Sequence, residues 1–79
     1  MKLYLVEVSF ITIEDYYITD EPIGIFTDKE FAIAFAKNYA TGHKNRKDFQ
    51  GYRISEWVAN DASKGEVHSR INYIVDWEE

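Results

Sequence analysis

The sequence predicts a single α+β domain in which one amphipathic helix packs on one face of a four-stranded antiparallel or mixed sheet. The chain has 79 residues, 46% of them hydrophobic and 16% aromatic, which is enough for one small core and leaves no room for a second. Four segments alternate with the period of strands, and one segment in the middle has helical spacing. We therefore expect the order β-β-α-β-β within a domain of residues 1–79, and a crossover through the helix that skips one strand predicts the sheet order 2-1-3-4.

The first two strands form a hairpin. Residues 2–14 carry apolar side chains on both faces, which is typical of a central strand that is partly covered on both sides. The polar pair Glu14-Asp15 marks the turn. The second strand, residues 16–26, contains Pro22, which cannot donate a ladder hydrogen bond and therefore indicates an edge strand or a bulge.

The helix has the clearest local signal. Thr27 and Glu30 have the spacing of a capping box with Thr27 as the N-cap, and we expect the helix to run to about Ala40. Gly42 suits the position just beyond its C-terminus. Three aromatic residues spaced by four share the face that we expect to pack on the sheet: Phe31, Phe35 and Tyr39.

A polar loop and a second hairpin follow the helix. Residues 41–51 are mostly polar, and residues 52–59 alternate as a third strand. Residues 60–65 form a turn by composition. In the last strand, residues 66–77, we expect one face to join the core, and that face carries Val67, Ile71, Tyr73, Val75 and Trp77.

Charge is distributed unevenly along the chain. The formal net charge is −5 and the pI is near 4.9, yet residues 41–53 carry four basic side chains and one acidic side chain. A net negative field repels nucleic-acid phosphates and attracts basic surfaces. Cysteine is absent, residues 1–10 do not resemble a signal peptide, and no apolar run is long enough to span a membrane, so we expect a cytoplasmic protein.

Recognisable catalytic and metal-binding motifs are missing from the sequence. It contains no Gly-x-Ser-x-Gly turn and no glycine-rich phosphate loop. The two histidines, His43 and His68, are far apart and have no cysteine beside them, whereas zinc needs three or four convergent ligands. We therefore expect a protein that is not an enzyme and has no cofactor or metal site.

Acidic side chains are concentrated in the first half of the chain. Six fall within seventeen residues, with Lys29 the only base among them. This density predicts one contiguous surface that binds a basic partner, although a solvated turn and a helix N-terminus also carry acids. The predicted partner-binding residues are Glu14, Asp15, Asp20, Glu21, Asp28 and Glu30.

The basic loop, Lys44 to Lys47, offers an alternative surface together with Arg53 after it. Basic groups interleaved with aromatic side chains bind single-stranded nucleic acids, and such a site would combine the loop with the sheet face that the helix leaves open. The net negative charge opposes this interpretation. Its candidate residues are Lys44, Arg46, Lys47, Arg53 and Trp57.

Three segments within residues 2–60, LYLVEV, EPIGIFTDKEFAIAFAKNYA and GYRISEWV, resemble a group of small uncharacterised ββαβ(β) domains of bacteria and their phages. Those domains begin with a hairpin, followed by a strand end of the type IGVF-S/T that caps an alanine-rich helix. The resemblance implies the fold and an origin in a phage or mobile element, and hence a location in the host cytoplasm. The matching residues are Ile23, Gly24, Ile25, Phe26, Thr27, Glu30, Ala32 and Ala36.

In size and charge the chain is also similar to phage inhibitors of host defence, including anti-CRISPR proteins, which occupy a channel or subunit surface of a larger enzyme. We therefore expect a small acidic binding protein that inhibits a host defence or nucleic-acid-handling complex by occupying its basic surface. The alternatives are a small RNA- or single-strand-binding domain and a homodimeric accessory or structural protein joined through an edge strand. None of these functions involves a membrane.

Overall fold

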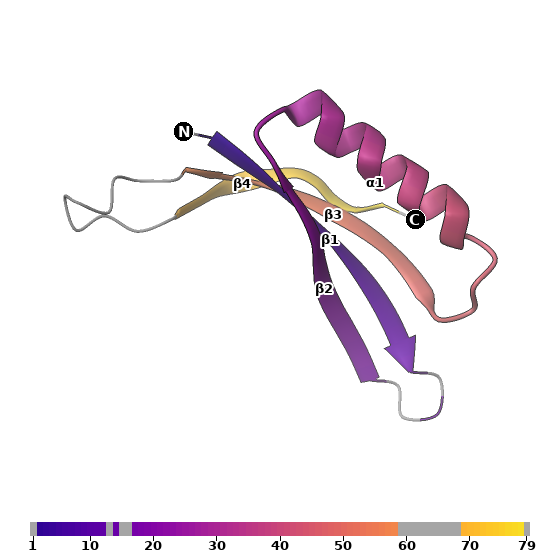
Figure 1. Cartoon of the computed structure of the whole chain (residues 1–79). Coiled ribbons are helices and arrows are strands. Elements are labelled where there is room, and N and C mark those ends of the chain that lie inside the picture. The colour runs from indigo at the N-terminus through magenta and orange to yellow at the C-terminus, as the bar shows by residue number, and fades with distance from the viewer. Residues whose placement is uncertain (1, 13, 15–16, 59–68, 79) are drawn as a thin grey trace.

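The computed structural model describes residues 2–12, 14, 17–58 and 69–78, in which one helix lies against one face of a four-stranded antiparallel sheet, as expected (Figure 1). Across the sheet the strands follow the order β2-β1-β3-β4, as predicted for a crossover that skips one strand. The order β-β-α-β-β thus describes the chain and not the sheet. Along the chain the elements are β1 (Lys2–Thr12), β2 (Tyr17–Phe26), α1 (Lys29–His43), β3 (Phe49–Val58) and β4 (Ser69–Glu78).

β1 is the central strand that its two apolar faces predicted, and it pairs with β2 on one side and β3 on the other. β2 is an edge strand, and its ladder also shifts register near the proline. Val6 lies opposite Gly24, whereas Glu7 lies opposite Pro22, so that one residue of β2 is left over. Both expectations for Pro22 are confirmed, because an edge and a bulge each spare its missing N–H from the ladder.

The helix begins one residue later than predicted. The N-cap is Asp28 and not Thr27, because the Asp28 carboxylate accepts a hydrogen bond from the backbone N–H of Phe31 at 3.1 Å. This is the geometry in which an N-cap side chain satisfies an unpaired helical N–H. Glu30 therefore lies in the first turn, where its charge complements the helix dipole, and does not close a capping box with Thr27.

The helix ends at His43, beyond the expected end at Ala40, and includes Gly42 in its last turn. The Thr41 hydroxyl donates to the backbone carbonyl oxygen of Lys37 at 2.9 Å. The imidazole ring of His43 stacks on the Tyr39 ring with centroids 4.0 Å apart. These contacts within the last turn extend the helix through a glycine that by itself favours termination.

The core lies between α1 and the two central strands. The line of the helix nearest the sheet is formed by Ala32 and Ala36, which are fully buried and permit a close approach. Phe35 and Tyr39 are half-buried beside this line, and Phe31 is 61% exposed, which corrects the expectation that all three aromatic residues face the sheet. The buried hydrophobic side chains are Tyr4, Val6, Val8, Ala32, Ala36, Tyr52 and Ile54.

β3 starts at Phe49, inside the segment predicted as a polar loop. The Phe49 ring packs against Phe10 with centroids 5.7 Å apart, and the ladder shifts register beside this contact. At this shift Gly51 has φ 146°, a backbone conformation that residues other than glycine rarely adopt. The turn predicted at residues 60–65 lies outside the described residues.

β4 does not keep the regular alternation that its sequence predicts. Val75 lies opposite Ile54, whereas Tyr73 lies opposite Ser55, so that Ile74 is left without a partner between them. Val75 therefore packs against the core while Tyr73 turns to the other face of the sheet. The prediction that both belong to one face is wrong, because one extra residue reverses the alternation of a strand.

Candidate functional site

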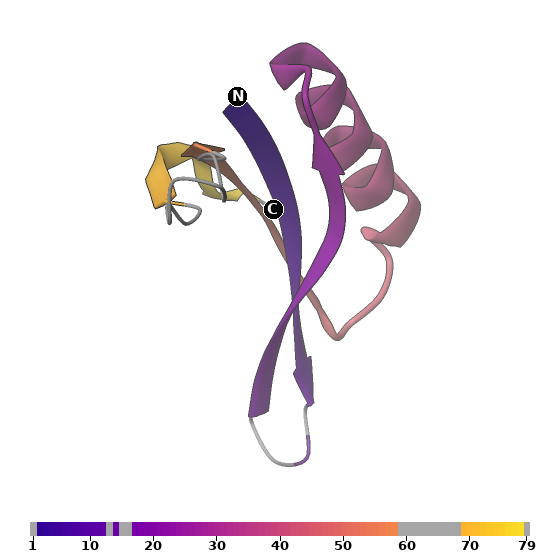
Figure 2. The same ribbon diagram turned by 60° about the vertical axis from the view of Figure 1, so that its left-hand side comes forward.

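The sheet face opposite α1, which we call the open face, is left uncovered by the other described elements (Figure 2). Because strand residues alternate between faces, each strand that buries one side chain under α1 presents the next on this face. Two hollows lie here. The apolar hollow, about 310 Å³, is lined by Leu3, Leu5, Ile25 and Trp57. The polar hollow, about 420 Å³, is lined by Ser9, Ile18, Asp20, Gln50, Arg53 and Trp77.

Three strands assemble the apolar hollow. Leu5 lies opposite Ile25 of β2 and Ser55 of β3, and Leu3 lies opposite Trp57. The Trp57 indole N–H donates to the Ser55 hydroxyl oxygen at 2.8 Å, which ties the indole to its own strand over a fully buried serine. Ile25 remains 66% exposed at the sheet edge. The hollow is therefore a pre-formed apolar surface with one fixed wall.

A bulge in β4 gathers three side chains around Arg53. Asp76 and Trp77 together lie opposite this one residue of β3, and Trp77 has φ 61°, which is rare for a bulky residue. The guanidinium carbon lies 4.0 Å from the Trp77 ring centroid and 4.6 Å from the Tyr73 ring centroid. The Arg53 Nε lies 3.1 Å from Asp76 Oδ1, so the cation is both paired and enclosed by rings.

The open face carries negative charge that this cluster does not neutralise. Asp76 pairs with Arg53, which leaves Glu7 and Asp20 on the same face. Among the described residues, neither of these two carboxylates is in an ion pair. Asp20 is exposed at the polar hollow, whereas Glu7 is half-buried opposite Arg53. The electrostatics of the face therefore favour a cation.

Two predicted acidic residues lie in the middle of β2. Asp20 lies opposite Ser9 and belongs to the open face, whereas Glu21 lies opposite Val8 and belongs to the side covered by α1. Neighbouring residues of a strand point to opposite faces, so adjacency in the sequence separates these two side chains.

The other predicted acidic residues lie near the two ends of β2. Asp28 and Glu30 are at the start of α1, next to the last residue of β2, and Glu14 comes before its first residue. Ten strand residues, about 30 Å, separate the two ends. Asp15 lies outside the described residues. The described acidic residues do not form the contiguous patch that their density predicted.

The basic loop follows the C-terminus of α1. Arg46 is engaged within the loop, because its Nη2 lies 2.6 Å from Asp48 Oδ2 and its Nε donates to Oδ1 at 2.9 Å. The hydrogen bond from Arg46 lowers the pKa of the Asp48 carboxyl group below its ordinary value. The guanidinium also lies 4.9 Å from the Phe10 ring centroid. Of the three predicted basic side chains in this loop, Arg46 is thus committed to a local contact.

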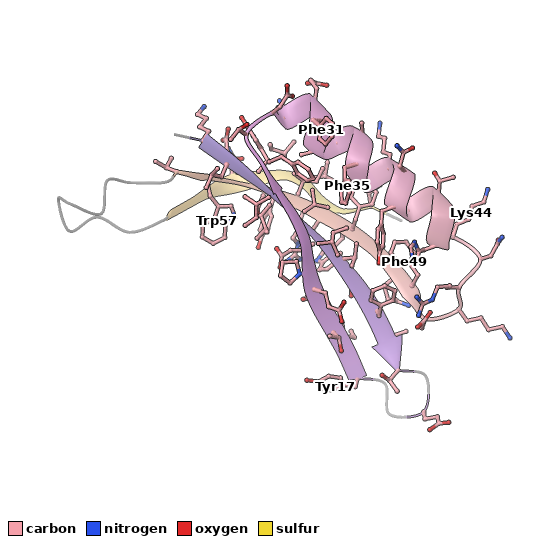
Figure 3. All side chains as sticks on the ribbon, in the orientation of Figure 1. Tyr17, Phe31, Phe35, Lys44, Phe49 and Trp57 are labelled. Atoms are coloured by element: carbon pink, nitrogen blue, oxygen red, sulfur yellow. The ribbon has the colours of Figure 1, made fainter. Side chains whose placement is uncertain are left out.

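The structure does not unite the predicted nucleic-acid-binding residues. Lys44 and Lys47 are exposed beyond the end of α1, whereas Arg53 and Trp57 line the hollows of the open face. Figure 3 shows Lys44 at the far end of α1 and Trp57 well apart from it. No single surface of the described chain therefore combines the basic loop with the aromatic residues of the open face.

The residues of β1 and β4 that build the two hollows were not predicted as functional residues from the sequence. Leu3 and Leu5 carried a usable signal, because they made the second face of the first strand apolar. Asp76 and Trp77 carried no such signal, because the alternation of the last strand does not indicate a bulge opposite Arg53.

Within the described part of the chain, no cluster of three histidine, cysteine, aspartate or glutamate side chains is placed to hold a metal ion. The one helix described is too short and too polar to cross a bilayer. Comparison with family models, curated proteins and solved structures finds no match to this chain.

Proposed function

We propose that this chain is a non-enzymatic binding domain that docks a basic partner protein on its open face. The apolar hollow carries the proposal. Its four large apolar side chains line a face that no other described element covers. Full burial stabilises such a side chain by ~1.5–3 kcal/mol, and a contiguous apolar surface with a polar rim is typical of an interaction site.

Charge selects the class of partner. The net charge of −5 and the carboxylates of Glu7 and Asp20 on the open face attract a basic surface and repel phosphates. Proteins that handle nucleic acids carry clustered lysine and arginine along their binding channels. We therefore propose a partner of this class in the host cytoplasm, and an inhibitory role of the anti-CRISPR type for a chain encoded by a phage or mobile element.

Two matched variants test the docking surface. Ile25 and Phe31 are 66% and 61% exposed, and they lie on the open face and on the helix respectively. Ile25→Lys and Phe31→Lys change the net charge equally, so a general electrostatic effect acts on both. Each variant and the parent would serve as bait for a bacterial host lysate, and captured proteins would be purified and titrated at two salt concentrations.

We expect a basic protein that binds the parent and Phe31→Lys, does not bind Ile25→Lys, and is released by salt. Equal binding by the two variants would contradict the open face as the docking surface. A parent that dimerises by itself, with Ile25→Lys monomeric, would favour the homodimer. Binding of a single-stranded oligonucleotide that is lost in Lys44→Glu would favour the nucleic-acid-binding alternative.

A further inference from the structure

The polar hollow lies beside the apolar hollow and has a different chemistry. Asp20 of β2 and Trp77 of β4 stand at its two sides, with Ser9 and Arg53 between them. The backbones of β2 and β4 are three strand spacings apart, about 14 Å. The side chains of Asp20 and Trp77 extend into part of this distance. The remaining space accommodates one side chain of a docked partner and not a whole secondary-structure element.

Trp77 is held in an unusual position at this hollow. Its backbone has φ 61°, and Arg53 lies against one face of its ring at 4.0 Å from the centroid. The side chain is nevertheless 38% exposed. A left-handed backbone at a bulky residue costs conformational free energy, and here it directs an aromatic ring to the surface of a hollow.

The charges at the hollow favour a cation over an anion. Asp20 and Asp76 are both negative, and Arg53 balances one of them. An exposed aromatic ring and an unpaired carboxylate together suit a guanidinium, which stacks on a ring while it donates hydrogen bonds in its own plane. A partner carboxylate or phosphate would meet Asp20 at the rim of the same hollow.

We infer that the polar hollow is a subsite for one arginine side chain of the basic partner, which pairs with Asp20 and stacks on the exposed part of Trp77. The inference rests on the proposed function and adds the residue type that the open face recognises. The apolar hollow then anchors the partner, and the arginine sets its register on the sheet.

A peptide titration tests the subsite without the partner. The probes are Ac-Gly-Arg-Gly-NH2 and its lysine and citrulline analogues, of which the citrulline peptide keeps the shape of arginine and lacks the charge. Trp57→Phe leaves Trp77 as the remaining tryptophan of the two, so indole fluorescence reports on this hollow. In that background, Asp20→Asn is compared with Glu21→Gln, which removes an equal charge from the neighbouring residue on the opposite face.

We expect the arginine peptide to change Trp77 emission, the citrulline peptide to bind at least about tenfold more weakly, and Asp20→Asn to weaken arginine binding about fivefold. Glu21→Gln should bind as its background does. Equal binding of the arginine and citrulline peptides, stronger binding of the lysine peptide, or equal effects of the two variants would overturn the inference. If Ile25→Lys loses the partner protein while Asp20→Asn retains full affinity, the subsite is wrong and the proposed function stands.

Discussion

Replacement of Arg53 by methionine should loosen β4 and leave the rest of the fold in place. β4 pairs with β3 through three register shifts, so its ladder is irregular and side-chain contacts must help to hold it. Arg53 contacts three side chains of β4. It lies over the rings of Tyr73 and Trp77, donates a hydrogen bond of 3.4 Å to the Tyr73 hydroxyl, and pairs with the carboxylate of Asp76. Methionine keeps the length and apolar character of the stem and removes the charge.

The size of the effect follows mainly from the two ring contacts and the ion pair. Each cation–π contact at a partly exposed site stabilises by ~0.5–1 kcal/mol. The ion pair adds less than ~1 kcal/mol, because the Asp76 side chain is 59% exposed. A loss of about 2 kcal/mol in the free energy of unfolding lowers the Tm of a domain this small by about 8–16 °C.

Thermal unfolding followed by circular dichroism would measure this loss, and hydrogen exchange would show whether the β4 amides open first. Arg46→Met is the matched control, because Arg46 also pairs with an aspartate and lies over one ring, with its side chain 52% exposed. We expect a clearly smaller change in Tm for this control. An Arg53→Met protein that melts within about 3 °C of the parent, or together with Arg46→Met, would refute the role given to Arg53.

Two further predictions concern the helix cap and alkaline pH. Asp28→Ala should lower the free energy of unfolding in urea by about 1 kcal/mol, and Thr27→Ala should change it little; the reverse ranking would restore Thr27 as the N-cap. Burial, together with the hydrogen bond to Glu78, raises the pKa of the Tyr52 hydroxyl above its ordinary value. Its stabilising contribution is therefore fully present below pH ~10 and is lost as the pH rises through the higher folded-state pKa. The melting temperature of the parent should fall above pH ~10, and that of Tyr52→Phe should fall less. Parallel pH profiles of the two proteins would disprove this prediction.

The sequence by itself determined the elements and the layer arrangement. Two apolar faces identified β1 as the central strand, and Pro22 identified β2 as an edge strand with a bulge. These features could be predicted because backbone donors and strand periodicity act locally. The limits of the helix were less predictable. At its start Asp28 competes with Thr27 for the N-cap position, and at its end the contact of His43 with Tyr39 extends the last turn beyond Gly42.

Only the tertiary structure decided the candidate site. The apolar hollow was partly readable, because Leu3 and Leu5 already formed a second apolar face, but the polar hollow was not. It depends on where β4 slips against β3, and each slip exchanges the faces of all residues beyond it. Tyr73 and Trp77 meet Arg53 because cross-strand packing favours the bulged register. That packing depends on both strands together, so the periodicity of neither strand alone predicts it.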